Sequence, residues 1–160
     1  MNGDRRASAR GRRGRRGFAL RLGDLAVQAI LASPLHGLVG DRFTVVKMRG
    51  LRSGRPVATP VNVRPDGDRY TVVSRRERVW WRNLRGGQPA VVHLNGISRP
   101  VRGEVIESAP QVADAQARHV ARYPDDARWL EISLDRTGQP QHDDLHRAAD
   151  ARVLVFLRFV

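Results

Sequence analysis

The chain has 160 residues, with 29 Lys or Arg against 16 Asp or Glu and a formal net charge of +13. Its hydrophobic fraction of 41% is typical of a folded domain, and its length is sufficient for one domain with a substantial core. Because it contains no cysteine, disulfides, iron–sulfur clusters, thiolate metal sites and a cysteine nucleophile are excluded. The positive charge indicates an anionic partner, such as nucleic acid, phospholipid or an anionic small molecule.

The N-terminal stretch is rich in Arg and Gly and has no apolar face. Such a stretch cannot offset the entropy lost on ordering, so we predict a disordered basic tail over residues 1–22. The tail could remain solvated, or it could contact nucleic acid or an anionic membrane surface. Its arginine pairs would suit an export signal, but Arg21, Asp24 and Gln28 interrupt the apolar stretch that such a signal requires. We therefore expect a cytoplasmic protein whose residues 23–160 form one domain.

The elements expected after the tail begin with a short amphipathic helix between Asp24 and Pro34. Beyond it the apolar period changes to two, which is the period of a β-strand. Turn signals at Arg64–Asp68 and Asn95-Gly96 indicate tight hairpins. The predicted strands cover residues 43–48, 57–63, 69–74, 90–94, 97–107 and 151–160.

Two further helices are predicted, a short one over residues 78–87 that ends in glycines and a longer one over residues 112–122. Strands that follow one another through tight turns are typical of an antiparallel meander. The last strand must find a free edge, and closing a barrel removes such edges. We therefore predict a mainly β fold with helices (α+β), a six-stranded antiparallel barrel with helices at its ends.

The spacing of His142 and His146 would present both imidazoles on one face of a helix, as in the zinc site of H-E-x-x-H proteases. No third ligand is evident in the sequence. Asp143 stands where a catalytic glutamate, one methylene longer, would belong in a zinc protease. We therefore interpret this segment as a solvated polar loop and predict no metal site.

The most informative residues lie in two arginine-rich segments. In GLRSGRP (residues 50–56), glycines free the backbone and Ser53 lies close to two arginines, so N–H groups, a hydroxyl and guanidinium groups could bind one anion. In SRRERVWWRNLR (residues 74–85), five arginines surround two tryptophans. This pattern suits a ligand with a flat ring and an anionic tail, and it equally suits single-stranded nucleic acid. It is also typical of a solvated basic turn beside core tryptophans.

The chain contains, in order, the strings GLRSGRPVATPVNV, DGDRYTVVS and WWRNLR. Together they resemble the deazaflavin-dependent nitroreductase family of the flavin/deazaflavin oxidoreductases. The resemblance extends from Phe43 to Glu107, with a looser match at Tyr123-Pro124 and in the last strand, whereas residues 131–149 look like an insertion. It implies a split β-barrel of the flavin-reductase and pyridoxamine-phosphate-oxidase type, in agreement with the barrel expected from the strand pattern.

The resemblance also implies an activity. It indicates an oxidoreductase that uses reduced coenzyme F-420 to transfer hydride to a quinone, a nitro compound or an enone-type compound. This cofactor has a flat deazaflavin ring, a phosphodiester and an oligoglutamate tail, so it is strongly anionic and matches the basic surplus of the chain. The protein would supply orientation and electrostatics to a small-molecule substrate, as a monomer or a homodimer.

The resemblance implies that the cofactor lies in a groove of the barrel, and it assigns cofactor-binding roles position by position. The positions are Arg52, Ser53, Gly54, Pro60, Val61, Asn62, Ser74, Arg75, Trp80, Asn83 and Arg85. The first three would hold the phosphate and the next three would follow the ring edge. The others would flank the ring, form the wall of the groove and meet the acidic tail. Tyr123 would line the substrate side as a candidate proton donor.

Three alternative functions remain open on the sequence. An FMN-binding split barrel would differ from the deazaflavin enzyme in which of the two cofactors it binds. A non-catalytic binder of an anionic apolar ligand, of the fatty-acid type, would show no cofactor turnover with menadione. A nucleic-acid-binding barrel would lose its affinity once the Arg/Gly tail is deleted.

Overall fold

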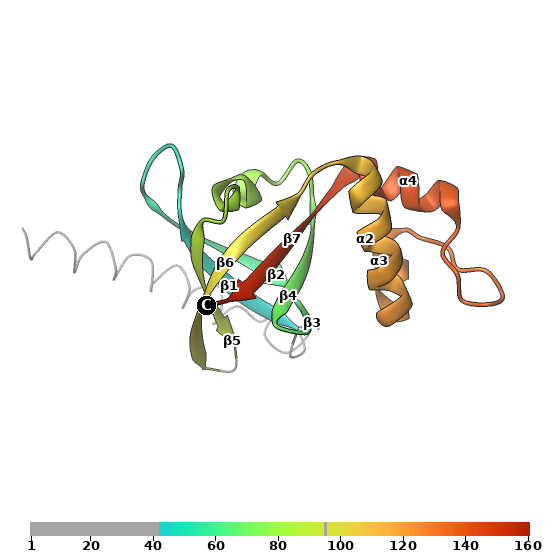
Figure 1. The fold of residues 1–160 in the computed structure, drawn as a ribbon, viewed down its shortest axis with the longest axis horizontal. Helices are drawn as coiled ribbons and strands as arrows, with labels where there is room; N and C mark the ends of the chain where they lie inside the picture. The colour runs from blue at the N-terminus through green and yellow to red at the C-terminus, as the bar shows by residue number, and fades with distance from the viewer. Residues whose placement is uncertain (1–41, 95) are drawn as a thin grey trace, which may run out of the picture.

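The computed structural model describes residues 42–94 and 96–160, so the predicted tail and the predicted helix between Asp24 and Pro34 lie outside the described residues. The strands are β1 (Phe43–Arg49), β2 (Pro56–Asn62), β3 (Arg64–Asp66), β4 (Arg69–Arg75), β5 (Pro89–Leu94), β6 (Ile97–Ile106) and β7 (Arg152–Phe159). The helical elements are η2 (Val79–Leu84), α2 (Ala109–Arg122), η3 (Pro124–Asp126), α3 (Ala127–Leu130) and α4 (His142–Ala151). Figure 1 shows a curled sheet with α2, α3 and α4 gathered on one side of it.

The sheet is antiparallel throughout, in the order β2-β1-β5-β6-β7-β4-β3. The predicted mainly β fold with helices, a split-barrel arrangement, is confirmed. The described sheet has seven strands rather than six, because Arg64–Asp66 of the predicted turn pairs with the start of β4. The meander prediction was wrong for the central strands, since β4 pairs with β7 instead of with β2.

The last strand explains this order. Six successive residues of β7, from Arg152 to Leu157, are buried. Because side chains of a strand alternate between its faces, such a strand needs cover on both faces. Val153, Val155 and Leu157 belong to the core inside the curled sheet, whereas Leu154 and Phe156 pack with the helices. This double burial places β7 in the sheet between β6 and β4, with the helices on its outer face.

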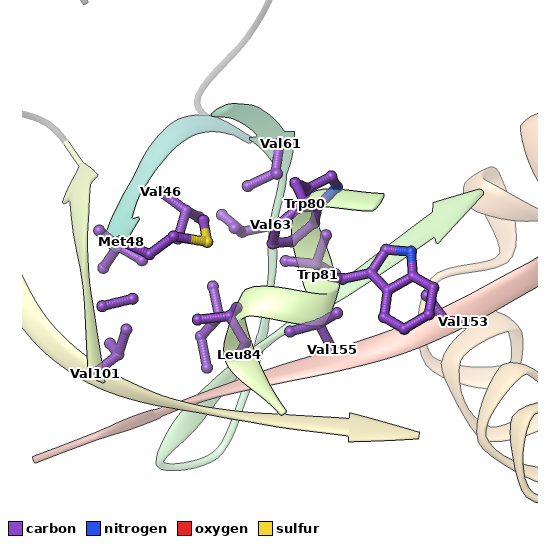
Figure 2. Packing of buried hydrophobic residues seen from close by; sticks show 14 residues of the cluster. Val46, Met48, Val61, Val63, Trp80, Trp81, Leu84, Val101, Val153 and Val155 are labelled. Carbon is purple, nitrogen blue, oxygen red and sulfur yellow. The ribbon is translucent and has the colours of Figure 1, made fainter. Parts of the chain in front are cut away.

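The core inside the curled sheet is closed by η2 (Figure 2). Trp80, Trp81 and Leu84 of this short helix are buried among valines from several strands. Leu84 packs directly against β6 at Gly103, where an added Cβ would lie 2.5 Å from the Leu84 Cβ. The close approach of helix and strand therefore depends on the missing side chain of Gly103.

The helix-covered face contains the segment predicted as a solvated loop. That prediction was wrong, because residues 142–151 form α4. Leu145, Ala148 and Ala149 make a buried apolar stripe, which packs in one cluster with residues of α2 and β7. The polar residues at the start of the helix, His142, Asp143 and Asp144, made this apolar stripe hard to recognise from the sequence. No helix within the described part of the chain is long and apolar enough to cross a membrane.

Arg76 connects this helix to the sheet. Its Nε donates to the carbonyl of Asp150 at 3.1 Å, and its Nη2 donates to the carbonyls of Glu107 and Arg152 at 2.9 and 3.0 Å. Carbonyl groups at the C-terminal end of a helix have no partner within the helix, and a cation is favourable there. Arg76 therefore caps α4 and joins it to the ends of β6 and β7.

We expect Gly103→Ala to lower the free energy of unfolding by about 1–3 kcal/mol, because the new Cβ would overlap with Leu84 in a packed core. Urea denaturation measures this change. The control is Glu104→Ala, at the adjacent exposed position of β6, which should cost about 1 kcal/mol or less. Wild-type stability in Gly103→Ala would contradict the requirement for close packing.

Candidate functional site

The candidate anion site is the turn between β1 and β2, which projects from the end of the sheet opposite to α2, α3 and α4 (Figure 1). Hydrogen bonds within the turn shape it. The Gly50 N–H donates to the Arg55 carbonyl at 2.9 Å, and the Gly54 N–H donates to the Gly50 carbonyl at 2.7 Å. Gly54 has a φ of 63°, a conformation that costs glycine little. The backbone of the turn is thus held in one shape.

The same turn is attached to η2. The Leu51 N–H donates to the Asn83 Oδ1 at 3.0 Å, which brings together two segments 32 residues apart in the sequence. The resemblance assigned Asn83 to the wall of the groove. Its amide oxygen accepts a hydrogen bond from the turn, so Asn83 positions the neighbouring residues Arg52 and Ser53.

Two backbone donors of the turn remain available. Within the described part of the chain, the N–H groups of Arg52 and Ser53 have no hydrogen-bond partner. The side chains of Arg52 and Arg55 are exposed beside them. The Ser53 hydroxyl accepts from the Arg55 N–H at 3.3 Å and keeps its own proton to donate. The turn therefore presents N–H, O–H and guanidinium donors to solvent, as an anion site requires.

The strand that follows the turn, β2, is an edge of the described sheet. An edge strand leaves part of its backbone N–H and C=O groups without ladder partners. Pro60 is exposed, Val61 is buried in the core, and Asn62 is half-buried. The Asn62 Oδ1 is buried without a hydrogen-bond partner in the described structure. A buried polar atom without a hydrogen-bond partner carries a cost in free energy.

Ser74 and Trp80 serve the core. Both are buried, and the Trp80 Nε1 donates to the Ser74 Oγ at 3.1 Å. Arg75 follows Ser74 on β4, so it points to the other face of the sheet, and its side chain is exposed. The structure therefore does not bring Ser74 and Arg75 to one side of a groove.

Arg85 forms a salt bridge with Glu107. Its guanidinium donates two hydrogen bonds to the Glu107 carboxylate, one of them from Nε to Oε1 at 2.7 Å. These hydrogen bonds hold the pKa of Glu107 below its ordinary value. Arg85 also lies over the ring of Trp81, with 5.0 Å between the guanidinium carbon and the ring centroid. Arg85 directly follows η2 and its charge is largely compensated by Glu107, so its contact with the acidic tail of the cofactor stays a prediction.

Tyr123 lies on the other side of the molecule, at the C-terminal end of α2. Its hydroxyl donates to the Pro65 carbonyl, and the Arg64 guanidinium lies over its ring, 4.8 Å from the centroid. Figure 1 shows α2, which ends just before Tyr123, on the side of the sheet away from the turn between β1 and β2, so the structure does not bring Tyr123 to this turn. Its role as a proton donor stays a prediction.

No sequence pattern indicated the buried charged cluster that lies close to Tyr123. Asp126 is buried and accepts from the Arg64 Nε at 2.8 Å, and the His119 Nε2 lies 2.8 Å from the same carboxylate. Burial raises the pKa of Asp126, but hydrogen bonds from Arg64, Trp129 and His119 outweigh it, and the net pKa is lowered. Burial lowers the pKa of His119 despite this carboxylate.

The two histidines considered for metal binding lie on α4, and both are exposed. The rings of His142 and His146 are in edge contact, with 4.3 Å between centroids. No group of three or more His, Cys, Asp or Glu side chains within residues 42–94 and 96–160 could hold a metal ion.

Comparison with known proteins supports the fold. No protein-family model and no curated sequence matches the chain. A pyridoxamine 5′-phosphate oxidase-related, FMN-binding protein from Nostoc punctiforme aligns over 96% of this chain and 84% of its own, with a TM-score of 0.52 and 15% identity. At this identity the likeness establishes a shared fold.

Two further solved structures are similar at lower TM-scores. A protein of unknown function from Agrobacterium tumefaciens gives a TM-score of 0.49 at 21% identity over 74% of this chain, which spans 48% of that protein's length. A protein described as an F-420 reductase gives 0.41 at 15% identity, over 75% of this chain and 87% of its own.

We expect the free energy of unfolding to fall as the pH is lowered from 7 to 5. Because burial lowers the pKa of His119 below its ordinary 6.5, the unfolded chain binds a proton in this range that the folded chain does not. The slope from one such group is at most about 1.4 kcal/mol per pH unit. Asp126, whose pKa lies below 3.8, adds its loss only at lower pH.

Urea denaturation at a series of pH values measures this slope. His119→Gln keeps a donor toward Asp126 but cannot titrate, so it should lose the slope between pH 7 and 5. His146→Gln, at an exposed position, is the control and should keep it. Equal slopes in wild type and His119→Gln would contradict the assignment.

Proposed function

We propose that this protein is an oxidoreductase that binds reduced coenzyme F-420 and reduces quinone, nitro or enone-type compounds. The observation that carries the proposal is the turn between β1 and β2. It combines unpaired N–H groups at Arg52 and Ser53 with exposed guanidinium groups, next to an edge strand. These groups suit a cofactor with an anionic chain attached to a flat ring.

The donors of the turn fit a phosphodiester. A phosphate accepts several hydrogen bonds at once, and N–H groups that belong to successive residues can converge on it. Arg52 would add a charge-assisted, bidentate contact. Asn83 would hold the turn in place through Leu51, and Gly54 would permit its left-handed backbone.

The edge of β2 fits the ring. The edge of a deazaflavin carries hydrogen-bond donors and acceptors, which could pair with the free backbone groups near Pro60 and Val61. The buried Asn62 Oδ1 lacks a donor, which a ring N–H could supply. Ser74 and Trp80, which are buried and bonded to each other, would support the neighbouring wall from inside the core.

The cofactor, when bound, would supply hydride from its reduced ring. The residues of the chain would bind the phosphate, orient the ring edge and exclude water from one ring face. None of these roles requires a strong acid or base from the protein. A proton for the reduced substrate would come from water, since the hydroxyl of Tyr123 donates to the Pro65 carbonyl away from the turn.

A different observation supports each of the two candidate cofactors. The strings GLRSGRPVATPVNV, DGDRYTVVS and WWRNLR, which contain the turn, the edge strand and η2, resemble the F-420-dependent family. The structural neighbour from Nostoc punctiforme is described as FMN-binding. FMN also combines a flat ring with a phosphate, so it is the second candidate cofactor for the same turn.

We expect oxidised F-420 to bind with a change in its fluorescence, and Arg52→Ala to weaken this binding by about 10- to 150-fold, the loss of one charge-assisted contact. Arg85→Ala should weaken it about fivefold or less, since Arg85 is exposed and already paired with Glu107. The control is Arg136→Ala, which removes an exposed arginine in the loop before α4.

Parallel titration with FMN and turnover of reduced F-420 with menadione complete the test. FMN binding without F-420 binding would favour the FMN protein. Binding of neither cofactor would contradict the proposal and favour a binder of anionic apolar ligands. Wild-type F-420 affinity in Arg52→Ala would show that the phosphate is held elsewhere.

A further inference from the structure

A second basic region lies on the helix-covered side of the sheet, around the first residue of β7. The Arg152 side chain is 6% exposed, and within the described part of the chain its guanidinium has one acidic partner, the Glu131 Oε1 at 3.5 Å. That carboxylate is 67% exposed to solvent, which weakens its attraction. Burial lowers the pKa of Arg152, and the nearby charge of Arg75 acts in the same direction. Arg152 is thus a buried cation with incomplete compensation.

The strand register adds a second unfavourable term. Arg75 of β4 is the direct cross-strand neighbour of Arg152 of β7. Like charges at directly opposite positions destabilise an antiparallel pair. The acid nearest to Arg75 is Glu77, at 3.9 Å, and both of these side chains are more than half exposed. Two arginines are therefore held at directly opposite positions of β4 and β7 without a well-placed anion between them.

These side chains surround a hollow of about 210 Å³. Its lining consists of Val73, Arg75, Arg78, Trp129 and Arg152. Arg78 is exposed and brings a third guanidinium, while Trp129 is 42% exposed although its side chain is large and apolar. The hollow is thus lined by three guanidinium groups, one indole ring and one valine side chain.

We propose that this hollow binds an aromatic carboxylate. A carboxylate matches the planar fork of an arginine in two parallel hydrogen bonds, and Arg152 is oriented for this by its burial. The aromatic ring would lie on Trp129 and Val73, which otherwise leave apolar surface in contact with water. The bound anion would also separate the like charges of Arg75 and Arg152.

This site is distinct from the proposed cofactor site. The turn that carries Arg52 lies at the end of the sheet away from the helices, whereas the hollow involves α3 and the helix-covered face of β4 and β7 (Figure 1). Binding to the hollow can therefore be measured without any cofactor, so failure of one proposal leaves the other intact.

The test is calorimetric titration of the full chain with benzoate, with cyclohexanecarboxylate, inorganic phosphate and chloride in parallel. We expect benzoate to bind and to raise the melting temperature, because a ligand of the folded state stabilises it. Arg152→Met should weaken benzoate binding by at least about tenfold, the loss of one charge-assisted contact. Trp129→Ala should remove the preference for benzoate over cyclohexanecarboxylate.

Stability without ligand distinguishes a binding role from a structural one. Apolar replacement of buried charges is often neutral or stabilising when no charge is left buried without a partner. The Glu131 side chain is 67% exposed, so the loss of Arg152 leaves no buried carboxylate. Arg152→Met without benzoate should therefore melt at or above the wild-type temperature. The control is Arg158→Met on the same strand, an exposed arginine paired with Asp68 and Glu104, which should keep benzoate binding.

Other outcomes overturn the proposal. They are benzoate binding no stronger than chloride binding, unchanged benzoate affinity in Arg152→Met, or phosphate binding as tight as benzoate binding and insensitive to Trp129→Ala. If Arg152→Met does not fold, the exposed Arg75 provides the deciding variant. The proposal then stands only if Arg75→Ala both weakens benzoate binding and raises the melting temperature without ligand. Any other result shows that Arg152 is structural and that the proposal is wrong.

Discussion

The burial of β7 on both faces is the constraint from which the rest of the structure follows. Val153, Val155 and Leu157 need apolar cover on one side, and Leu154 and Phe156 need it on the other. A flat sheet with one wet face cannot provide both. The sheet therefore curls around the first set, with η2 closing the interior, while α2 and α4 cover the second set.

This arrangement determines where the basic residues can lie. The interior of β7 is apolar, so its arginines stand at the two ends of the strand, at Arg152 and Arg158. At one end, Arg76 crosses to the carbonyl groups at the end of α4 and joins helix, β6 and β7. At the same end, Arg152 is buried beside Arg75 because the register of β4 and β7 places them opposite each other.

The two candidate anion sites differ in physical construction. The turn between β1 and β2 is exposed and relies on backbone N–H groups that its own hydrogen bonds hold in place. Salt should weaken the contribution of its arginines, because exposed charges are screened. The hollow around Arg152 relies on a buried guanidinium, for which screening is smaller. The two proposed sites would thus recognise an extended anionic cofactor and a compact anion in different ways.

The sequence by itself determined what local rules decide. Alternation of β-branched residues located the strands, and Leu94 and Ile97, on either side of the predicted hairpin turn, pair with each other in β5 and β6. The arginine-rich turn before β2 was evident from its residue types. These features depend on residues close together in the chain, so periodicity and turn chemistry were sufficient to predict them.

Only the tertiary structure decided the rest. The strand order depends on the double burial of β7, and α4 depends on an apolar stripe that needs α2 as its partner. The buried cluster joins Arg64 to Asp126, 62 positions later in the chain, and to His119, and nothing in the local pattern marks these residues. Whether Ser74 and Arg75 share a face, and whether Arg152 meets Arg75, is set by register and packing. Contacts of this kind form between segments that are distant in the sequence, so periodicity and turn chemistry along the chain do not predict them.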